Sequence, residues 1–170
     1  ANVLESCKHL KNDCVVVCVT TDKVYQNNEW VYPYRESDAL GGHDPYSASK
    51  AASELIIQSY RKSFFSSGPI QIASARAGNV IGGGDWSEDR LIPDIVRSIY
   101  NNEPVVLRNP NAVRPWQHVL DPLHGYLTLA EKMFNKPHSF CNAWNFGPEV
   151  HEAQTVGDEI GRATRLNSSH

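Results

Sequence analysis

The feature that most constrains the fold is an unbroken apolar run, Cys14–Val19. Its length and its β-branched valines predict a strand, and the lack of polar alternation predicts that both faces of this strand are buried. Strands of this kind are typical of parallel sheets that helices cover on both sides. A second run, Ile70–Ala75, predicts another such strand.

Helical patterns precede and separate these two runs. Residues 2–11 carry apolar side chains at helical spacing. Asp44 and Pro45 are typical of an N-cap followed by proline at the first helical position, and they predict a helix that ends near Tyr60. The order helix, strand, helix, strand predicts an α/β fold with right-handed crossovers.

The second half of the chain has a less regular pattern. We expect, in order, a glycine-rich loop at 77–88, a short helix at 92–99, strands at 104–107 and 115–119, a helix from Asp121, a strand at 143–146 and a last helix capped by Thr155.

These elements predict two regions. Residues 1–77 are expected to form the C-terminal part of a Rossmann-like doubly wound parallel sheet. Residues 78–165 are expected to form mostly a smaller substrate-binding region, with 115–147 partly returning to the sheet. Residues 166–170 carry no pattern, and we expect them to be a tail of uncertain origin.

Composition narrows the classes of function. The chain has 170 residues, 41% of them hydrophobic, which suits one globular domain or a large piece of one. A net charge of -3 without a basic run argues against a nucleic-acid partner. There is no apolar stretch long enough for a bilayer and no signal-peptide pattern, so we expect a cytoplasmic protein without a membrane partner.

The cysteines and histidines predict no metal. Cys7, Cys14, Cys18 and Cys141 are spaced neither as a zinc ribbon nor as a Cys-x-x-Cys pair, which favours free thiols in a reducing compartment. The seven histidines are scattered, with no His-x-x-x-His pattern.

Tyr46 and Lys50 are the first candidate for chemistry. Residues four apart share a helix face. An ammonium in that place can depress the pKa of a phenol, and such a phenol can take a proton from an alcohol and return it to a ketone. Tyr-x-x-x-Lys is also common as a surface pair on an amphipathic helix.

Two further polar clusters follow the two predicted strands directly. Thr20–Tyr25 comes after the first strand, and Arg76–Asn79 comes after the second. Ligands bind open parallel sheets at the carboxyl ends of the strands, and Tyr46 begins the helix that leaves this same edge. We therefore expect the three clusters to meet in one crevice.

Together these motifs resemble the extended short-chain dehydrogenase/reductase family, and among its nucleotide-sugar members the 4,6-dehydratases of CDP-sugars. The likeness extends to about Arg162. It is carried by the segments Thr20–Tyr25, Gly41–Lys50, Arg76–Trp86 and Arg114–Val119.

The resemblance implies a catalytic role for five residues. Tyr46 would be the base for the sugar C4 hydroxyl, Lys50 would hold the nicotinamide ribose of NAD and favour the tyrosinate, and Thr21 would bind the same hydroxyl. Lys23 would remove the C5 proton as a free amine. Asp22 would protonate the departing C6 hydroxyl. The hydride would then return to C6 and a proton to C5, which gives a 4-keto-6-deoxy sugar nucleotide and water.

Other contacts are implied as well. The implied cofactor contacts are Tyr46, Lys50, Thr20 and Ala77, and the implied substrate contacts are Asn79, Arg90, Leu91 and Arg114. An arginine fork suits a diphosphate, although Arg114 can also be a surface arginine and Asn79 a turn former. The family also implies a homo-oligomer, dimer or tetramer, and a place in deoxysugar synthesis for lipopolysaccharide O-antigens.

The elimination places opposite demands on two neighbours. The pKa of Lys23 must fall and that of Asp22 must rise; burial does both, whereas an ion pair between them opposes both. The reaction therefore predicts a dry crevice. The related dTDP-glucose enzymes usually have a glutamate where this chain has Lys23, which favours the CDP-sugar subgroup.

The chain also departs from the family pattern. It contains no Gly-x-x-Gly-x-x-Gly turn, so we expect an internal fragment that lacks the first strands of the sheet and is inactive alone. Two alternatives stay open. A sugar-nucleotide 4-epimerase would need Tyr46, Lys50, Thr21 and NAD but no Asp22–Lys23 pair, and a truncated chain would have no catalysis at all.

Overall fold

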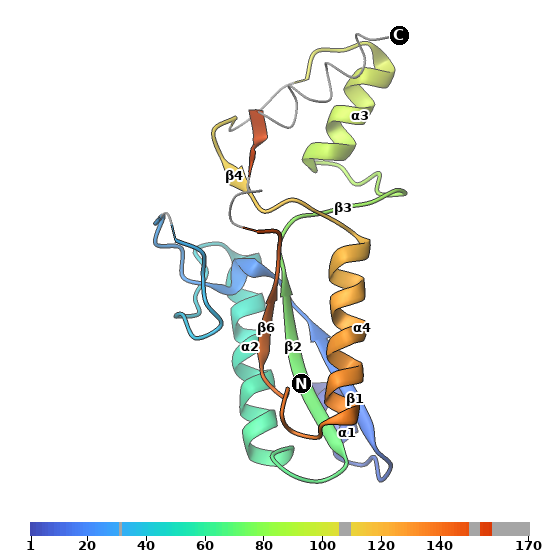
Figure 1. The fold of residues 1–170 in the computed structure, drawn as a ribbon. Helices are drawn as coiled ribbons and strands as arrows, with labels where there is room; N and C mark the ends of the chain where they lie inside the picture. The colour runs from blue at the N-terminus through green and yellow to red at the C-terminus, as the bar shows by residue number, and fades with distance from the viewer. Residues whose placement is uncertain (31, 106–109, 150–153, 158–170) are drawn as a thin grey trace. The chain divides into compact units, whose positions relative to one another are not determined.

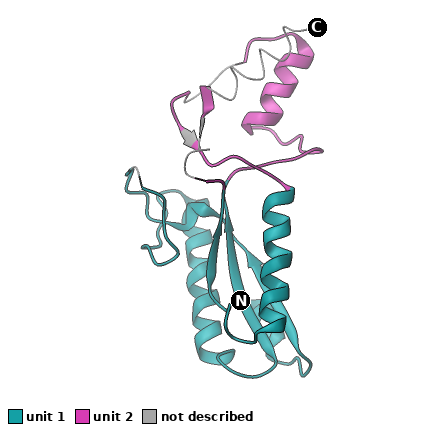
Figure 2. Cartoon of the chain, viewed as in Figure 1, with its two compact units in different colours: residues 1–78, 120–147 teal, residues 79–119, 148–170 magenta. Residues whose placement is uncertain are grey.

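The computed structural model describes residues 1–30, 32–105, 110–149 and 154–157, drawn as a coloured ribbon in Figure 1. The chain divides into two compact units (Figure 2). Unit 1 comprises residues 1–78 and 120–147. Unit 2 comprises the described residues of 79–119 and 148–170.

Unit 1 is built on a parallel sheet in the order β1-β2-β6. Strand β1 is Cys14–Val19, β2 is Ile70–Ala77 and β6 is Ala143–Phe146. Every residue of β2 is buried because β2 lies between the other two strands. The predicted parallel α/β sheet is confirmed, although β2 ends at Ala77 rather than Ala75.

The prediction that β1 is buried on both faces is wrong for the described part of the chain. Its residues are half-buried, and Val19 is exposed. The reason is position: within the described sheet β1 is an edge strand with β2 as its one neighbour. An apolar run cannot distinguish an edge strand from a central one.

Helices cover both faces of this sheet (Figure 1). Helices α1 (Asn2–Cys7) and α2 (Pro45–Phe64) pack on one face against alternate β1 residues, Val16 and Cys18. Helix α4 (Leu120–Asn135) packs on the other face against Val15 and Val17. Alternation along a strand thus supplies two cores, as a doubly covered sheet requires.

Helix boundaries differ slightly from the predicted ones. Helix α1 ends at Cys7, where the sequence predicts helix to residue 11, and α4 begins at Leu120 instead of Asp121. A short 3₁₀ helix, η1 (Asp22–Val24), follows β1. Helix α4 approaches β6 closely at Gly125. A Cβ on this residue would lie only 2.4 Å from the Phe146 ring.

The described residues of unit 2 form helix α3 (Leu91–Asn101), two strand pairs and a helical stretch at 156–157. Strand β3 (Val80–Ile81) runs parallel to β5 (Gln117–His118), and β4 (Val113–Arg114) runs antiparallel to β7 (Gln154–Thr155). Helix α3 (Leu91–Asn101) confirms the predicted helix, one residue early.

Two other predictions for unit 2 have different outcomes. The strand expected at 104–107 falls largely outside the described residues. Thr155, the expected cap of a last helix, is the final residue of β7; residues 156–157 directly after it are helical, and the rest of the expected helix lies outside the described residues.

Two kinds of feature are absent from the described ranges. No helix there has the length and apolarity that a bilayer crossing needs. Nor do three or more His, Cys, Asp or Glu side chains gather there as metal ligands would. All four cysteines carry free thiols.

Candidate active site

The first turn of α2 is fixed by Asp44. One oxygen of its carboxylate accepts hydrogen bonds from the backbone N–H groups of Tyr46 (2.9 Å) and Ser47 (3.0 Å). The other accepts the Ser47 hydroxyl at 2.5 Å. These bonds, the Ser47 hydroxyl first, lower the pKa of Asp44. The predicted cap is confirmed, and it fixes where Tyr46 and Lys50 lie on the helix.

The structure brings Tyr46 and Lys50 together. The Lys50 Nζ lies 6.0 Å from the centroid of the Tyr46 ring. Lys50 is half-buried, and Tyr46 is 52% exposed. The phenol is therefore within the electrostatic reach of an ammonium and open to a substrate.

Thr21, Asp22 and Lys23 form the turn that follows β1. The buried Thr21 caps η1: its Oγ1 accepts a hydrogen bond from the Lys23 N–H at 3.4 Å and donates to the Asp22 carboxylate at 3.2 Å. Helix α2 packs against η1. The five predicted catalytic residues thus lie on two neighbouring elements of unit 1.

The dry crevice is not provided by the described residues of unit 1. Lys23 is exposed, Asp22 is half-buried and Tyr46 is 52% exposed. The dryness that the elimination demands would therefore have to come from groups outside this unit.

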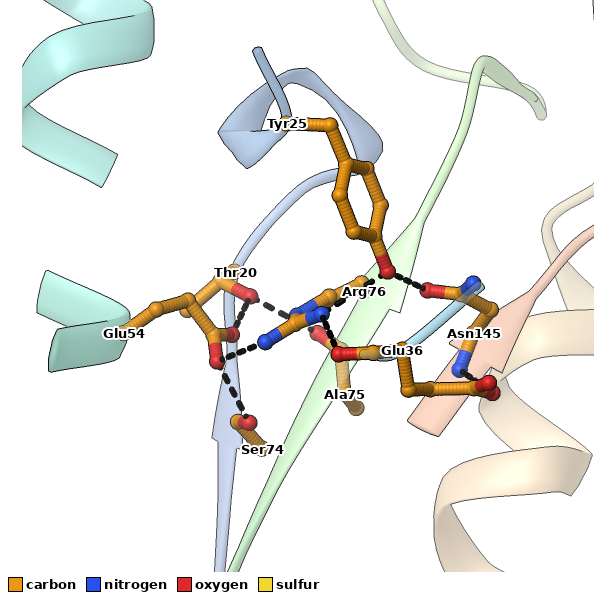
Figure 3. Close-up of polar contacts among 8 residues, drawn as sticks. All are labelled: Thr20, Tyr25, Glu36, Glu54, Ser74, Ala75, Arg76 and Asn145. Atoms are coloured by element: carbon orange, nitrogen blue, oxygen red, sulfur yellow. Dashed lines mark hydrogen bonds and ion pairs between the residues drawn. The ribbon is translucent and has the colours of Figure 1, made fainter. Parts of the chain in front are cut away.

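A buried ion pair between Glu54 and Arg76 lies next to the Thr21–Lys23 turn (Figure 3). The sequence analysis did not predict this pair. Glu54 on α2 is 2% exposed and Arg76 on β2 is 4% exposed; the Glu54 Oε2 lies 2.8 Å from an Arg76 nitrogen. The carboxylate also accepts hydrogen bonds from the hydroxyls of Thr20 (2.5 Å) and Ser74 (2.8 Å). Both charges are therefore paired within the core, as buried charges need to be.

The same guanidinium reaches the turn and the loop beyond it. Arg76 Nη1 donates to the Tyr25 hydroxyl at 2.8 Å and to the Glu36 backbone oxygen at 3.1 Å. The Tyr25 hydroxyl donates to the Asn145 side-chain oxygen at 2.6 Å. The Asn145 backbone N–H donates to the Glu36 carboxylate, and the Asn145 side-chain amide donates to the Tyr34 backbone oxygen.

The electrostatics of this network are those of a charged pair. Burial by itself raises the pKa of Glu54, but hydrogen bonds from Arg76 and Thr20 and the charge of Arg76 outweigh it and hold that pKa below its ordinary value. Burial raises the pKa of Tyr25 against the opposing effect of Arg76. One sequence signal was available, because Glu54 follows Lys50 by four residues and so shares its helix face.

The remaining predicted binding residues have the following places. In unit 1, the Thr20 hydroxyl donates to Glu54, and Ala77 is buried at the end of β2. In unit 2, the Asn79 backbone oxygen accepts a hydrogen bond from the Gln117 N–H. Arg90 is exposed and pairs with Asp85 at 2.9 Å. Leu91 begins α3, and Arg114 is exposed in β4. Their contacts to cofactor and substrate stay predictions.

Gly42 yields a first testable prediction. A Cβ on Gly42 would lie 2.3 Å from the Ser47 Cβ and 2.5 Å from the Ala48 backbone nitrogen, at the start of α2. Gly42→Ala is therefore expected to lower the free energy of unfolding by about 1–3 kcal/mol in a urea titration. Gly41→Ala is the matched control, since its Cβ would meet Gln26 no closer than 3.7 Å. Equal stability of the two variants would contradict the close approach.

A parallel sheet with a Tyr-x-x-x-Lys helix at its carboxyl edge defines the class of short-chain dehydrogenase/reductase-like proteins. The chain belongs to the NAD dependent epimerase/dehydratase family, whose pattern it matches over residues 1–147. The resemblance predicted from the motifs is thereby confirmed.

Two relatives show which enzymes the chain resembles in sequence. The chain is 50% identical to the CDP-glucose 4,6-dehydratase of Salmonella typhimurium over 160 residues, which are 91% of this chain and 45% of that enzyme. It is 33% identical over 111 residues to the dTDP-D-glucose 4,6-dehydratase of Dictyostelium discoideum, covering 59% of this chain and 24% of that enzyme. The chain thus spans less than half the length of these relatives.

Solved structures share the fold. The UDP-glucuronic acid 4-epimerase of Bacillus cereus, in complex with UDP-glucuronic acid and NAD, matches 99% of this chain and 50% of its own, with a TM-score of 0.82 at 21% identity. The dTDP-glucose 4,6-dehydratase of Bacillus anthracis, in complex with NAD, matches 99% of this chain and 50% of its own, with a TM-score of 0.77 at 23% identity.

Proposed function

We propose that the protein to which this chain belongs is a sugar-nucleotide 4,6-dehydratase with CDP-glucose as substrate. The observation that carries the proposal is the Thr21-Asp22-Lys23 turn on η1, next to the helix that carries Tyr46 and Lys50. The 50% identity to the Salmonella enzyme supports it. The chain covers 45% of that enzyme, so the activity is proposed for the longer protein.

NAD is the proposed cofactor. The half-buried Lys50 ammonium and the Tyr46 phenol, on one face of α2, are the donor and acceptor types that suit the nicotinamide-ribose end of a dinucleotide. When bound, NAD would supply reversible hydride transfer with the sugar. The pyrophosphate would need a glycine-rich turn, and the sequence of this chain has no Gly-x-x-Gly-x-x-Gly motif.

The residues of this chain would manage the protons. Tyr46 takes the proton from the C4 hydroxyl, which Thr21 holds, while the Lys50 ammonium favours the phenolate. The C4 ketone acidifies the C5 proton, and Lys23 removes it as a free amine. Asp22 gives a proton to the C6 hydroxyl, which leaves as water. Once the hydride taken from C4 has been returned at C6, C5 would regain a proton, and the product would be the 4-keto-6-deoxy sugar nucleotide.

Isotope tracing in the longer protein tests this function. Incubated with NAD and CDP-glucose in D2O, the protein should form a 4-keto-6-deoxy product with one deuterium at C5. A substrate deuterated at C4 should carry that deuterium to C6. Product identity is read by mass spectrometry and NMR. A C4-inverted hexose that keeps its C6 oxygen would contradict the proposal and indicate an epimerase.

The base of the nucleotide is tested with the same assay. CDP-glucose should exceed dTDP-glucose and UDP-glucose in kcat/KM. Lys23→Met should abolish deuterium entry at C5, since no amine then removes that proton. Turnover that prefers dTDP-glucose would contradict the CDP assignment alone.

We infer three further properties of the whole protein. The exposed apolar side chains of Leu55 and Ile56 on α2 support a homo-oligomer, dimer or tetramer. Four free thiols support a cytoplasmic location. A 4-keto-6-deoxy product would feed deoxysugar synthesis, as for lipopolysaccharide O-antigens.

A further inference from the structure

The turn Thr21–Lys23 is bracketed by two residues that bind the same buried pair. Thr20, directly before the turn, donates its hydroxyl to Glu54 at 2.5 Å. Tyr25, just beyond it, accepts a hydrogen bond from Arg76 at 2.8 Å. Because Glu54 and Arg76 are themselves paired at 2.8 Å, both ends of the turn are tied to one ion pair (Figure 3).

Glu54 also belongs to the helix that carries the other half of the site. It follows Lys50 by one helical turn and Tyr46 by two, on the same face of α2. Arg76 belongs to the central strand β2, where every residue is buried. The pair therefore joins three elements, β1 with its turn, β2 and α2, at the level of the candidate catalytic residues.

We propose that Glu54, Arg76 and Tyr25 form a clamp that sets the position of the Thr21–Lys23 turn relative to α2. None of the three is placed on the substrate; they are positioning residues. Their catalytic consequence rests on the proposed function, because that function assigns Thr21 and Lys23 to the sugar. Proton transfer needs heavy atoms within hydrogen-bond reach, and a misplacement of 1 Å costs rate steeply.

The charge of the pair suits this role better than an apolar contact would. A guanidinium offers donors in a fixed planar fork, so it fixes direction as well as distance. Arg76 uses this fork on Glu54 and on Tyr25 at once. Apolar packing of equal volume can be as stable, but it does not fix direction in the same way.

Tyr25→Phe tests the clamp in the longer protein, because it removes one hydroxyl and keeps the ring. We expect faster amide exchange at Gln26 and Gly41, whose backbone N–H groups bond to Ala39 and Val24 across the loop. The expected acceleration is about fivefold or more. We also expect kcat to fall about 10- to 100-fold while KM stays nearly constant.

Two matched controls separate position from stability. Tyr60→Phe removes the same atom from a tyrosine of α2 whose hydroxyl donates to Glu5, away from the clamp. Ile57→Val trims a buried side chain of α2 in the core around Ile72, and it lowers stability without touching the network. Both should leave the exchange at Gln26 and Gly41 and the kcat close to wild type.

Three outcomes would overturn the clamp. The first is unchanged exchange at Gln26 and Gly41 in Tyr25→Phe, and the second is an unchanged kcat. The third is an equal loss of kcat in Ile57→Val. Amide exchange needs no substrate, so this measurement tests the clamp even if the wild-type protein forms no 4-keto-6-deoxy sugar. Absence of that product would contradict the proposed function and would leave the clamp untouched.

Discussion

Replacement of Tyr46 by phenylalanine in the longer protein is expected to slow formation of the 4-keto-6-deoxy product about 10²- to 10⁴-fold. The phenol oxygen is the one atom that the substitution removes, and it is the proposed acceptor of the C4 proton. The ring stays beside Lys50, whose Nζ lies 6.0 Å from its centroid. Affinity for the nucleotide sugar should therefore change little, and the loss should fall on kcat.

Rapid-quench single-turnover kinetics measure this effect free of product release. Tyr100→Phe is the matched control, since Tyr100 is a strongly exposed residue of α3 that has no part in the proposed chemistry. It should keep the wild-type rate. A Tyr46→Phe variant that forms product at the wild-type rate would remove the basis of the proposed acid–base chemistry.

Loss of Arg76 is expected to produce the largest effect on stability. Arg76→Met leaves the Glu54 carboxylate in the core without its cation, a change that costs about 3–5 kcal/mol of unfolding free energy in buried pairs. Urea unfolding measures the loss. Arg90→Met is the matched control: Arg90 pairs with Asp85 at a similar 2.9 Å, but this pair is exposed to solvent and should contribute little to stability.

The pH dependence gives this prediction a sign. In the wild type, the pKa of Glu54 is lower in the folded chain than in the unfolded one. Its contribution to stability is thus present above the unfolded value of about 4.3 and is lost as pH falls through the lowered folded value. In Arg76→Met, burial would raise that pKa. The stability gap between the two proteins should narrow in acid, and a gap that widens there would contradict the buried-pair account.

Local sequence patterns predicted the main elements of unit 1 because each pattern has a local physical cause. The Asp44 carboxylate caps the same helix that it precedes, so the start of α2 could be placed to the residue. Strand β1 could be predicted because its run is apolar, and β2 because apolar residues predominate in Ile70–Ala75. The exposure of β1 could not, since burial depends on which strands lie beside it.

The candidate site was predictable in part for a topological reason. Parallel strands end at one edge, so the Thr21–Lys23 turn and the Tyr46–Lys50 pair had to come near one another. The clamp was not predictable in the same way. Glu54 and Arg76 lie on different elements, and no local period shows that two charged side chains are buried against each other. The dryness of the site also depends on more than these residues.

The attachment of the loop that contains Tyr34 and Glu36 has a consequence for how the sequence of this protein can change in evolution. Asn145 binds the Glu36 carboxylate, but two other attachments, from Arg76 to Glu36 and from Asn145 to Tyr34, use backbone oxygens that every amino acid possesses. Side chains of that loop can therefore be exchanged over evolution while these two attachments persist. Sequence change in this loop would leave its hydrogen bonds to Arg76 of β2 and Asn145 of β6 in place.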